Sequence, residues 1–154
     1  MKIKRNILVE DSRILIYLAN YMTINKVKSV KMRYFLSKNN GEGNTIFGPE
    51  LKAINDAGFN DFEKKRIELV SKYGVKDDKG KLIIKENGQV DIINMDEFNK
   101  EVEEIKKGFA DLWKFLDEEI EINPYKININ DIPDEIIEDQ PTMDRLTKYV
   151  TESA

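Results

Sequence analysis

An unbroken helical periodicity between residues 98 and 120 constrains the fold of this chain most. Apolar residues recur there at steps of three and four positions, which places them on one face of an α-helix. They are Phe98, Val102, Ile105, Phe109, Leu112, Leu116 and Ile120. Asn94 or Asp96 precedes the run and is suited to cap its first turn. The spacing predicts one long amphipathic helix that packs its apolar face on the rest of the domain.

Two further helices are expected in the first 40 residues. Asp11 and Ser12 are good N-cap residues, so the first of these helices is predicted over about residues 12–22. The next helix is predicted to bury apolar side chains at helical spacing and to carry lysines on its outer face. The side chains predicted to be buried are Val27, Val30 and Tyr34.

Glycine-rich stretches divide the middle of the chain. Residues 39–44 are the clearest break, and short helices are predicted over 49–57 and from residue 60 to 73. Gly74 is expected to end the second of these in the left-handed conformation. Asp77–Gly80 is a turn signal, and the Asn87-Gly88 pair between apolar runs predicts a hairpin of strands at 82–84 and 90–93. The fold class is therefore α+β, mainly helical with a small antiparallel hairpin or sheet.

The last 35 residues change in character. Ile120, Ile122, Ile127 and Ile129 alternate with polar residues, which predicts an edge strand. Residues 131–139 are acidic and carry a proline, so the expected organisation is one domain over 1–130 followed by a linker and a docking helix over 131–154. Apolar side chains follow one face of that short helix. They are Met143, Leu146, Tyr149 and Val150.

A helix of this length is marginal in water unless it packs on something. Two interpretations follow: it docks on its own domain, or it docks in a groove of another subunit. Trp113 and Phe115 raise a similar choice, because they flank the apolar stripe of the long helix rather than lie on it. Either another element of the fold covers these aromatic side chains, or they form part of a binding surface.

The residue types exclude much of enzyme chemistry. The sequence has neither cysteine nor histidine, which excludes serine triads, Cys–His dyads, disulfides and ordinary zinc sites. The Asp77 turn lacks the ligand spacing of a calcium-binding EF-hand loop. Glu10 and Asp11 have no second acid at the spacing of phage lysozymes, because Ala19 and Asn20 stand there. We therefore expect neither an enzyme nor a bound cofactor or metal.

Charge is distributed unevenly along the chain. Residues 1–40 carry nine basic against two acidic residues, a net of +7, and residues 96–154 carry seven against seventeen, a net of −10. Opposite charges favour packing of the two ends on one another. The acidic run over 117–121 opposes the dipole of the preceding helix, so the basic second helix, a metal or a basic partner is expected to compensate it.

The sequence also bears on nucleic acid and membranes as partners. Lys26, Lys28, Lys31 and Arg33 form a basic patch, with Tyr34 and Phe35 as possible stacking faces, but a pI of about 5.1 argues against nucleic acid. The longest uncharged run, residues 14–25, is too short to span a bilayer.

Several motifs resemble a family of small tailed-bacteriophage proteins whose function is unassigned. The similarity covers about residues 1–130 and includes Lys38-Asn39, the Arg66–Gly74 helix end, the Asp77–Gly80 turn and the Glu119–Ile122 strand. Residues 40–59 look like an insertion, and the tail after Asp131 has no counterpart. The resemblance implies a phage protein in the host cytoplasm or the virion, and it carries no catalytic residues with it.

Two functions are consistent with these features. The first is a structural or assembly protein of the tail or head–tail region, which contacts other phage or host proteins and is part of an oligomeric assembly. The alternative is an inhibitor of a host defence nuclease, which would use acidic residues to block a basic groove.

Overall fold

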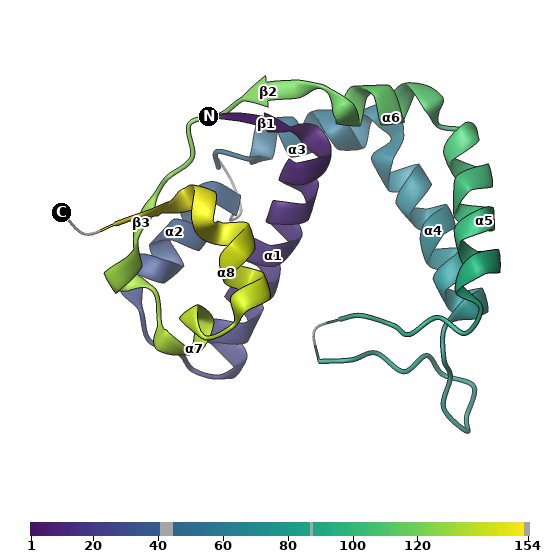
Figure 1. Cartoon of the computed structure of the whole chain (residues 1–154), viewed down its shortest axis with the longest axis horizontal. Coiled ribbons are helices and arrows are strands. Elements are labelled where there is room, and N and C mark those ends of the chain that lie inside the picture. The colour runs from purple at the N-terminus through teal and green to yellow at the C-terminus, as the bar shows by residue number, and fades with distance from the viewer. Residues whose placement is uncertain (41–44, 87, 153–154) are drawn as a thin grey trace. The chain divides into compact units, whose positions relative to one another are not determined.

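The computed structural model of the chain describes residues 1–40, 45–86 and 88–152. It has a mainly helical α+β fold with a small antiparallel sheet, as the sequence predicts (Figure 1). The chain divides into two compact units, which we call unit 1 (residues 1–53 and 117–154) and unit 2 (residues 54–116). This division differs from the expected boundary at residue 130, because the C-terminal segment belongs to the core of unit 1.

Unit 1 is built on helix α1 (Arg5–Ile24), which is nearly twice as long as the sequence predicts. Its buried side chains recur at helical spacing and include Leu8, Leu15 and Leu18. Asp11 and Ser12, predicted as caps, lie inside the helix and are buried. The N–H of Arg5 donates to the carbonyl of Glu118 at 3.2 Å, so the first turn finds a backbone partner outside the helix.

Strand β1 (Lys2–Lys4) pairs antiparallel with β2 (Glu119–Glu121). The register places Lys2 opposite Glu121 and Lys4 opposite Glu119. Opposite charges that face each other across strands favour this pairing. The central pair, Ile3 and Ile120, contributes to the core of unit 1.

Helix α2 (Val30–Asn40) turns a different face to the core than the predicted one. The buried side chains are Met32, Phe35, Leu36 and Asn39. Val30 and Tyr34, predicted to be buried, are 85% and 51% exposed, and Val27 is half-buried. Most of the predicted break after α2 lies outside the described residues. Helix α3 (Gly48–Ile54) follows, with Pro49 near its start as predicted.

The C-terminal segment completes unit 1. Strand β3 (Ile127–Asn128) leads into the 3-10 turn η2 (Ile129–Asp131) and the short helix α7 (Asp134–Ile137). Helix α8 (Gln140–Leu146) and the 3-10 turn η3 (Thr147–Tyr149) then bring the chain back to β4 (Val150–Thr151), which pairs parallel with β3. The predicted continuous edge strand is thus divided between β2 and β3.

Unit 2 begins with the π-helical turn η1 (Asn55–Phe59) and continues in α4 (Asn60–Tyr73). Gly58 takes a positive φ of 105°, which interrupts the helix where the sequence predicts a stop. Helix α4 ends at Tyr73 as predicted. Gly74, however, is extended with φ −70° and ψ 147°, not left-handed.

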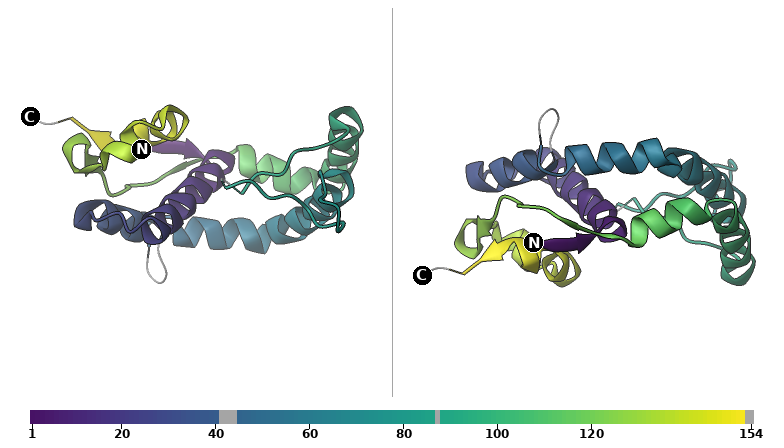
Figure 2. Two further views of the ribbon diagram at one scale, coloured as in Figure 1. Left: turned by 90° about the horizontal axis from the view of Figure 1, so that it is seen from below. Right: turned by 90° about the horizontal axis from the view of Figure 1, so that it is seen from above.

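The predicted long helix consists of two helices, α5 (Met95–Lys107) and α6 (Ala110–Asp117). Asn94 caps α5 as predicted, because its side chain accepts from the N–H of Glu97. The N–H groups of Gly108 and Phe109 each bond to the carbonyl three residues earlier, and this tight turn ends α5. Helices α4 and α5 lie side by side (Figures 1 and 2).

The predicted hairpin over 82–93 is replaced by an irregular arrangement that we call the ribbon (residues 74–93). Residues 74–76 form isolated antiparallel bridges, Gly74 with Ile92 and Lys76 with Leu82. Asp77 Oδ1 accepts from the N–H groups of Lys79 and Lys81, which confirms the predicted turn. Asn87 lies outside the described residues, so the predicted Asn-Gly turn is only partly seen; Gly88 has a φ of 81°.

Across the described ranges, no helix is both long and apolar enough to cross a membrane.

Candidate protein-binding surfaces

The C-terminal side chains predicted to bind a partner lie in or against the core of their own unit. Leu146 and Tyr149 are 1% and 0% exposed. Met143 and Val150 are half-buried and pack on the same core. Phe35 and Phe47 contact the ring of Tyr149 at centroid distances of 6.2 Å and 6.0 Å. The structure therefore favours the interpretation in which this segment docks on its own domain.

Polar contacts to α1 hold the same segment. The hydroxyl of Tyr149 donates to Asp11 Oδ2 at 2.5 Å, and Lys148 Nζ lies 2.7 Å from the same oxygen. Arg145 forms an ion pair with Glu10, the residue before Asp11 in α1. Burial, followed by the bond to Asp11, raises the pKa of Tyr149 above its ordinary value. The second carboxylate oxygen, Asp11 Oδ1, is buried without a hydrogen-bond partner among the described residues.

This buried cluster acts as a structural clamp. Asp11 and Tyr149 are 2% and 0% exposed, so a substrate has no access to either side chain. A buried carboxylate needs donors, and the tyrosine and lysine supply them on one side of the group. Sequence reasoning missed the pair because Asp11 and Tyr149 are 138 positions apart. An acid inside an apolar helical stripe was the one available signal.

Trp113 and Phe115, the other predicted partner-binding residues, are both half-buried. Phe62 of α4 meets the Trp113 ring edge-to-face at a centroid distance of 5.3 Å. The Nζ atom of Lys106 lies 4.7 Å from the same ring. Helices α4 and α5 therefore cover Trp113, as the first of the two interpretations expects.

The acidic run over 117–121 is compensated by the N-terminus of the chain. Lys4 Nζ lies 2.8 Å from Asp117, and Arg5 Nη1 lies 2.7 Å from Glu118. The bond to Asp117 raises the pKa of Lys4. Helix α2, a metal or a partner was expected in this role, whereas Lys4 and Arg5 pair with Asp117 and Glu118. The described residues contain no group of three or more acidic side chains that could hold a metal.

The basic patch before and at the start of α2 is only partly available as a binding face. Phe35 is fully buried, so it offers no stacking surface. Tyr34 is exposed but meets Tyr125 edge-to-face at 5.0 Å. Arg33 donates to the carbonyls of Met22 and Val27, which ties its guanidinium to the end of α1.

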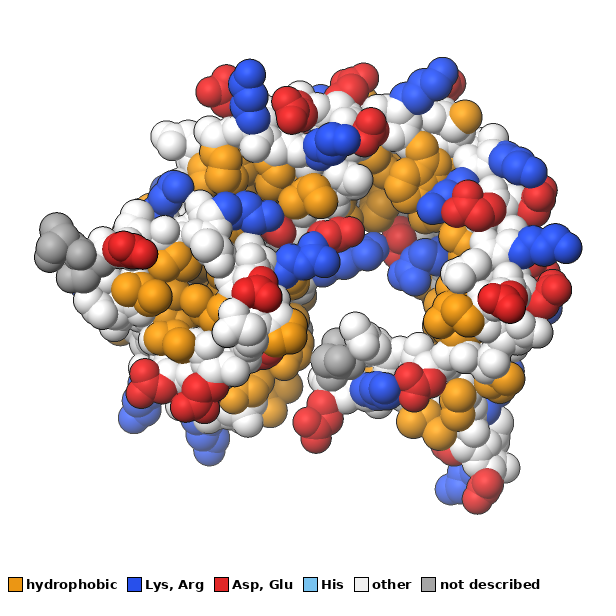
Figure 3. All heavy atoms as spheres, viewed as in Figure 1, with side chains coloured by type: hydrophobic (Ala, Val, Ile, Leu, Met, Phe, Trp, Pro, Cys, Tyr) orange, Lys and Arg blue, Asp and Glu red, His pale blue; other side chains and the backbone are white. Residues whose placement is uncertain are grey.

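The ribbon of unit 2 and the start of α5 carry a group of exposed aliphatic side chains that the sequence analysis did not identify. Their exposures lie between 47% and 73%, and they are Ile83, Ile84, Ile93 and Met95. Figure 3 shows hydrophobic side chains on this part of unit 2, with charged side chains beside them. Isolated exposed aliphatic residues are common, but several within one short segment are typical of a binding surface.

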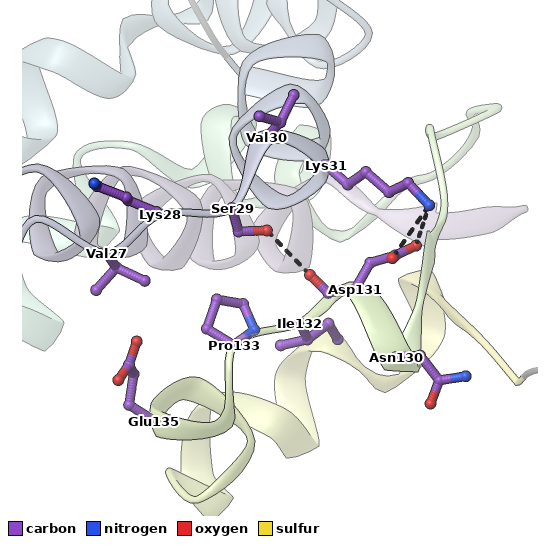
Figure 4. Close-up of a pocket in the computed structure, with 10 residues that line it drawn as sticks. All are labelled: Val27, Lys28, Ser29, Val30, Lys31, Asn130, Asp131, Ile132, Pro133 and Glu135. Atoms are coloured by element: carbon purple, nitrogen blue, oxygen red, sulfur yellow. Dashed lines mark hydrogen bonds and ion pairs between the residues drawn. The ribbon is translucent and has the colours of Figure 1, made fainter.

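A shallow groove of about 400 Å³ lies in unit 1 between the start of α2 and residues 130–135 (Figure 4). Val27, Val30, Ile132 and Pro133 give it an apolar part. Polar and charged side chains complete the lining; they are Lys28, Ser29, Lys31, Asn130, Asp131 and Glu135.

No known family model, curated protein or solved structure matches the chain.

Proposed function

We propose that the protein works by binding other proteins, as a structural or assembly component encoded by a tailed phage, and that it is not an enzyme. The virion is the proposed location, in the tail or the head–tail region. The phage assignment rests on the resemblance of the Arg66–Gly74 and Asp77–Gly80 motifs to small phage proteins. The mode of action rests on the surface of unit 2.

The observation that carries this proposal is the exposure of the ribbon. Ile84 and Ile93 leave 66% and 73% of their surface in water, which forfeits hydrophobic stabilisation that a partner would recover. The described residues of the ribbon form isolated bridges and single backbone hydrogen bonds, such as Val75 N–H to the carbonyl of Asp91, but no continuous ladder. A partner that presents apolar side chains and an extended backbone would both cover the isoleucines and extend the pairing.

The alternative function, inhibition of a host nuclease by acidic mimicry, has less support. Such an inhibitor needs carboxylates that are free to meet a basic groove. Glu119 and Glu121 stand opposite Lys4 and Lys2 on the neighbouring strand. Asp117 and Glu118 are paired with Lys4 and Arg5. Basic side chains of the same unit therefore already face this acidic run.

Mass spectrometry of purified virions tests the proposal. A structural component should be present at a fixed copy number per particle, and that number should persist through density-gradient purification and a high-salt wash. A chain found only in the lysate of infected cells would contradict the virion assignment. A phage enzyme of known soluble expression provides the control for carry-over of unassembled protein.

A further inference from the structure

We propose that unit 1 associates with a second copy of itself through the groove between α2 and residues 130–135. This surface lies in the other unit from the ribbon, and the inference does not depend on the proposed virion role. A second copy fits this groove because the groove combines an exposed apolar side chain, a small apolar part and side chains of both charges.

The groove is held open in a defined shape by contacts across it. Lys31 Nζ lies 3.2 Å from Asp131 Oδ1, and the Ser29 hydroxyl donates to the backbone carbonyl of Asp131 at 3.2 Å (Figure 4). The Ser29 hydroxyl also accepts from the N–H of Met32, so it is fixed at the start of α2. These bonds set the distance between the two walls. A partner therefore meets a surface that needs little reorganisation.

Besides the Lys31–Asp131 pair, the two walls carry two opposite charges with no ion-pair partner among the described residues. Lys28 extends from the α2 side and Glu135 from the α7 side, and Figure 4 shows them on opposite walls at the same end of the groove. Both side chains are exposed, and neither forms an ion pair with another residue of the described ranges. A partner with an acid facing Lys28 and a base facing Glu135 would match them.

A second copy of the same groove supplies that arrangement. In a two-fold interface whose axis runs along the groove, a residue on one wall meets the opposite wall of the other copy, and the reverse contact forms at the same time. Lys28 of each copy then faces Glu135 of the other. Val30 is 85% exposed at the rim and provides the apolar side chain that enters the hollow beside Ile132 and Pro133. The charges of the face are thus complementary to those of a second copy.

Charge reversal gives the sharpest test, with sedimentation velocity of the full chain as the measurement. Wild type should form a dimer in a concentration-dependent manner at up to about 1 mM protein. Lys28→Glu and Glu135→Lys should each weaken the dimer about tenfold or more, since each places like charges together. A mixture of these two variants should restore association, because every cross-contact in the mixed dimer is again attractive. The double variant should restore it as well.

Val30→Asp adds an independent measurement, since it should abolish the dimer while Lys28 and Glu135 stay unchanged. Lys64→Glu in unit 2 is the matched control and should leave the dimer intact. A wild type that stays monomeric throughout the range overturns the proposal. A dimer that is unaffected by all three substitutions also overturns the proposal, because the contact then lies on another face. These substitutions are Lys28→Glu, Glu135→Lys and Val30→Asp. Circular dichroism confirms that each variant is folded.

Discussion

The hydroxyl of Tyr149 donates a 2.5 Å hydrogen bond to the buried carboxylate of Asp11, and this contact joins the C-terminal segment to the first helix. Lys148 approaches the same oxygen, so two consecutive residues converge on one acid. The contact explains why residues 140–151 belong to unit 1 and do not form a free docking helix. It also makes the segment's stability measurable through one side chain.

Removal of this hydroxyl should weaken unit 1. Tyr149→Phe keeps the ring among Phe35 and Phe47 and deletes only the bond to Asp11. We expect a loss of about 1.5–3 kcal/mol in the free energy of unfolding, the usual contribution of a hydrogen bond to a charged group. Urea denaturation followed by circular dichroism measures it. Tyr125→Phe is the control and should change stability by less than about 0.5 kcal/mol, since Tyr125 is exposed.

The same hydroxyl predicts a loss of stability at alkaline pH. Burial and the Asp11 bond raise the pKa of Tyr149 in the folded state above the ordinary value of 10.0. The folded state therefore holds this proton more tightly than the unfolded state does. The stabilisation is complete below pH 10 and decreases as the pH rises from there toward the folded pKa. The difference in stability between wild type and Tyr149→Phe should thus be constant near neutrality and shrink above about pH 10. A pH-independent difference would contradict this origin.

A glycine is required at position 74 because neighbouring atoms leave no room for a Cβ atom, and not because of the backbone conformation there. A Cβ atom there would lie 2.5 Å from Leu82 Cδ2 and 2.6 Å from the carbonyl oxygen of Val70. Gly74→Ala should therefore destabilise unit 2 by about 1–3 kcal/mol, as overpacking commonly does. Trp113, the sole tryptophan, lies in unit 2, so its fluorescence during denaturation reports on this unit.

Gly108→Ala is the matched control for Gly74. A Cβ at Gly108 would meet only the carbonyl of Ile105, at 3.4 Å, and its φ of −73° suits any residue. This variant should be neutral or slightly stabilising, because alanine restricts the unfolded chain more than glycine does. Equal losses at the two positions would show that the close approach at Gly74 carries no energetic cost.

Local patterns predicted the types of element better than their ends or their buried faces. The stripe over 98–116 correctly indicated helix, and Asn94 correctly indicated its start, whereas Ile120 lies in strand β2 and not in the predicted helix. The interruption at Gly108 was hidden, since Phe109 continues the apolar spacing across the break and packs edge-to-face on Phe62. Gly58, in contrast, has a positive φ that marks a stop in the sequence as well as in the structure.

The errors in unit 1 come from contacts between distant residues. Asp11 was predicted to be a helix cap because acidic side chains are seldom buried inside a helix. Its partner Tyr149 could not be predicted from neighbouring residues, because it lies 138 positions away. The buried face of α2 was assigned from Val30 and Tyr34, whereas Phe35 is buried against Tyr149 from the other end of the chain. The exposed isoleucines of the ribbon were likewise unpredictable, because a strand pattern does not reveal which side lacks a neighbour.

The proposal that the ribbon binds a virion partner is tested most directly by the amount of protein that assembles into particles. Quantitative mass spectrometry should compare virions from phage that encode wild type, Ile84→Asp, Ile93→Asp or Ile67→Asp. Ile67 is 55% exposed on α4 and serves as the control outside the ribbon. Both ribbon variants should be depleted at least about tenfold, consistent with the burial of an uncompensated charge, while Ile67→Asp assembles normally. Normal incorporation of Ile84→Asp and Ile93→Asp, with Trp113 fluorescence showing that unit 2 is folded, would contradict the account.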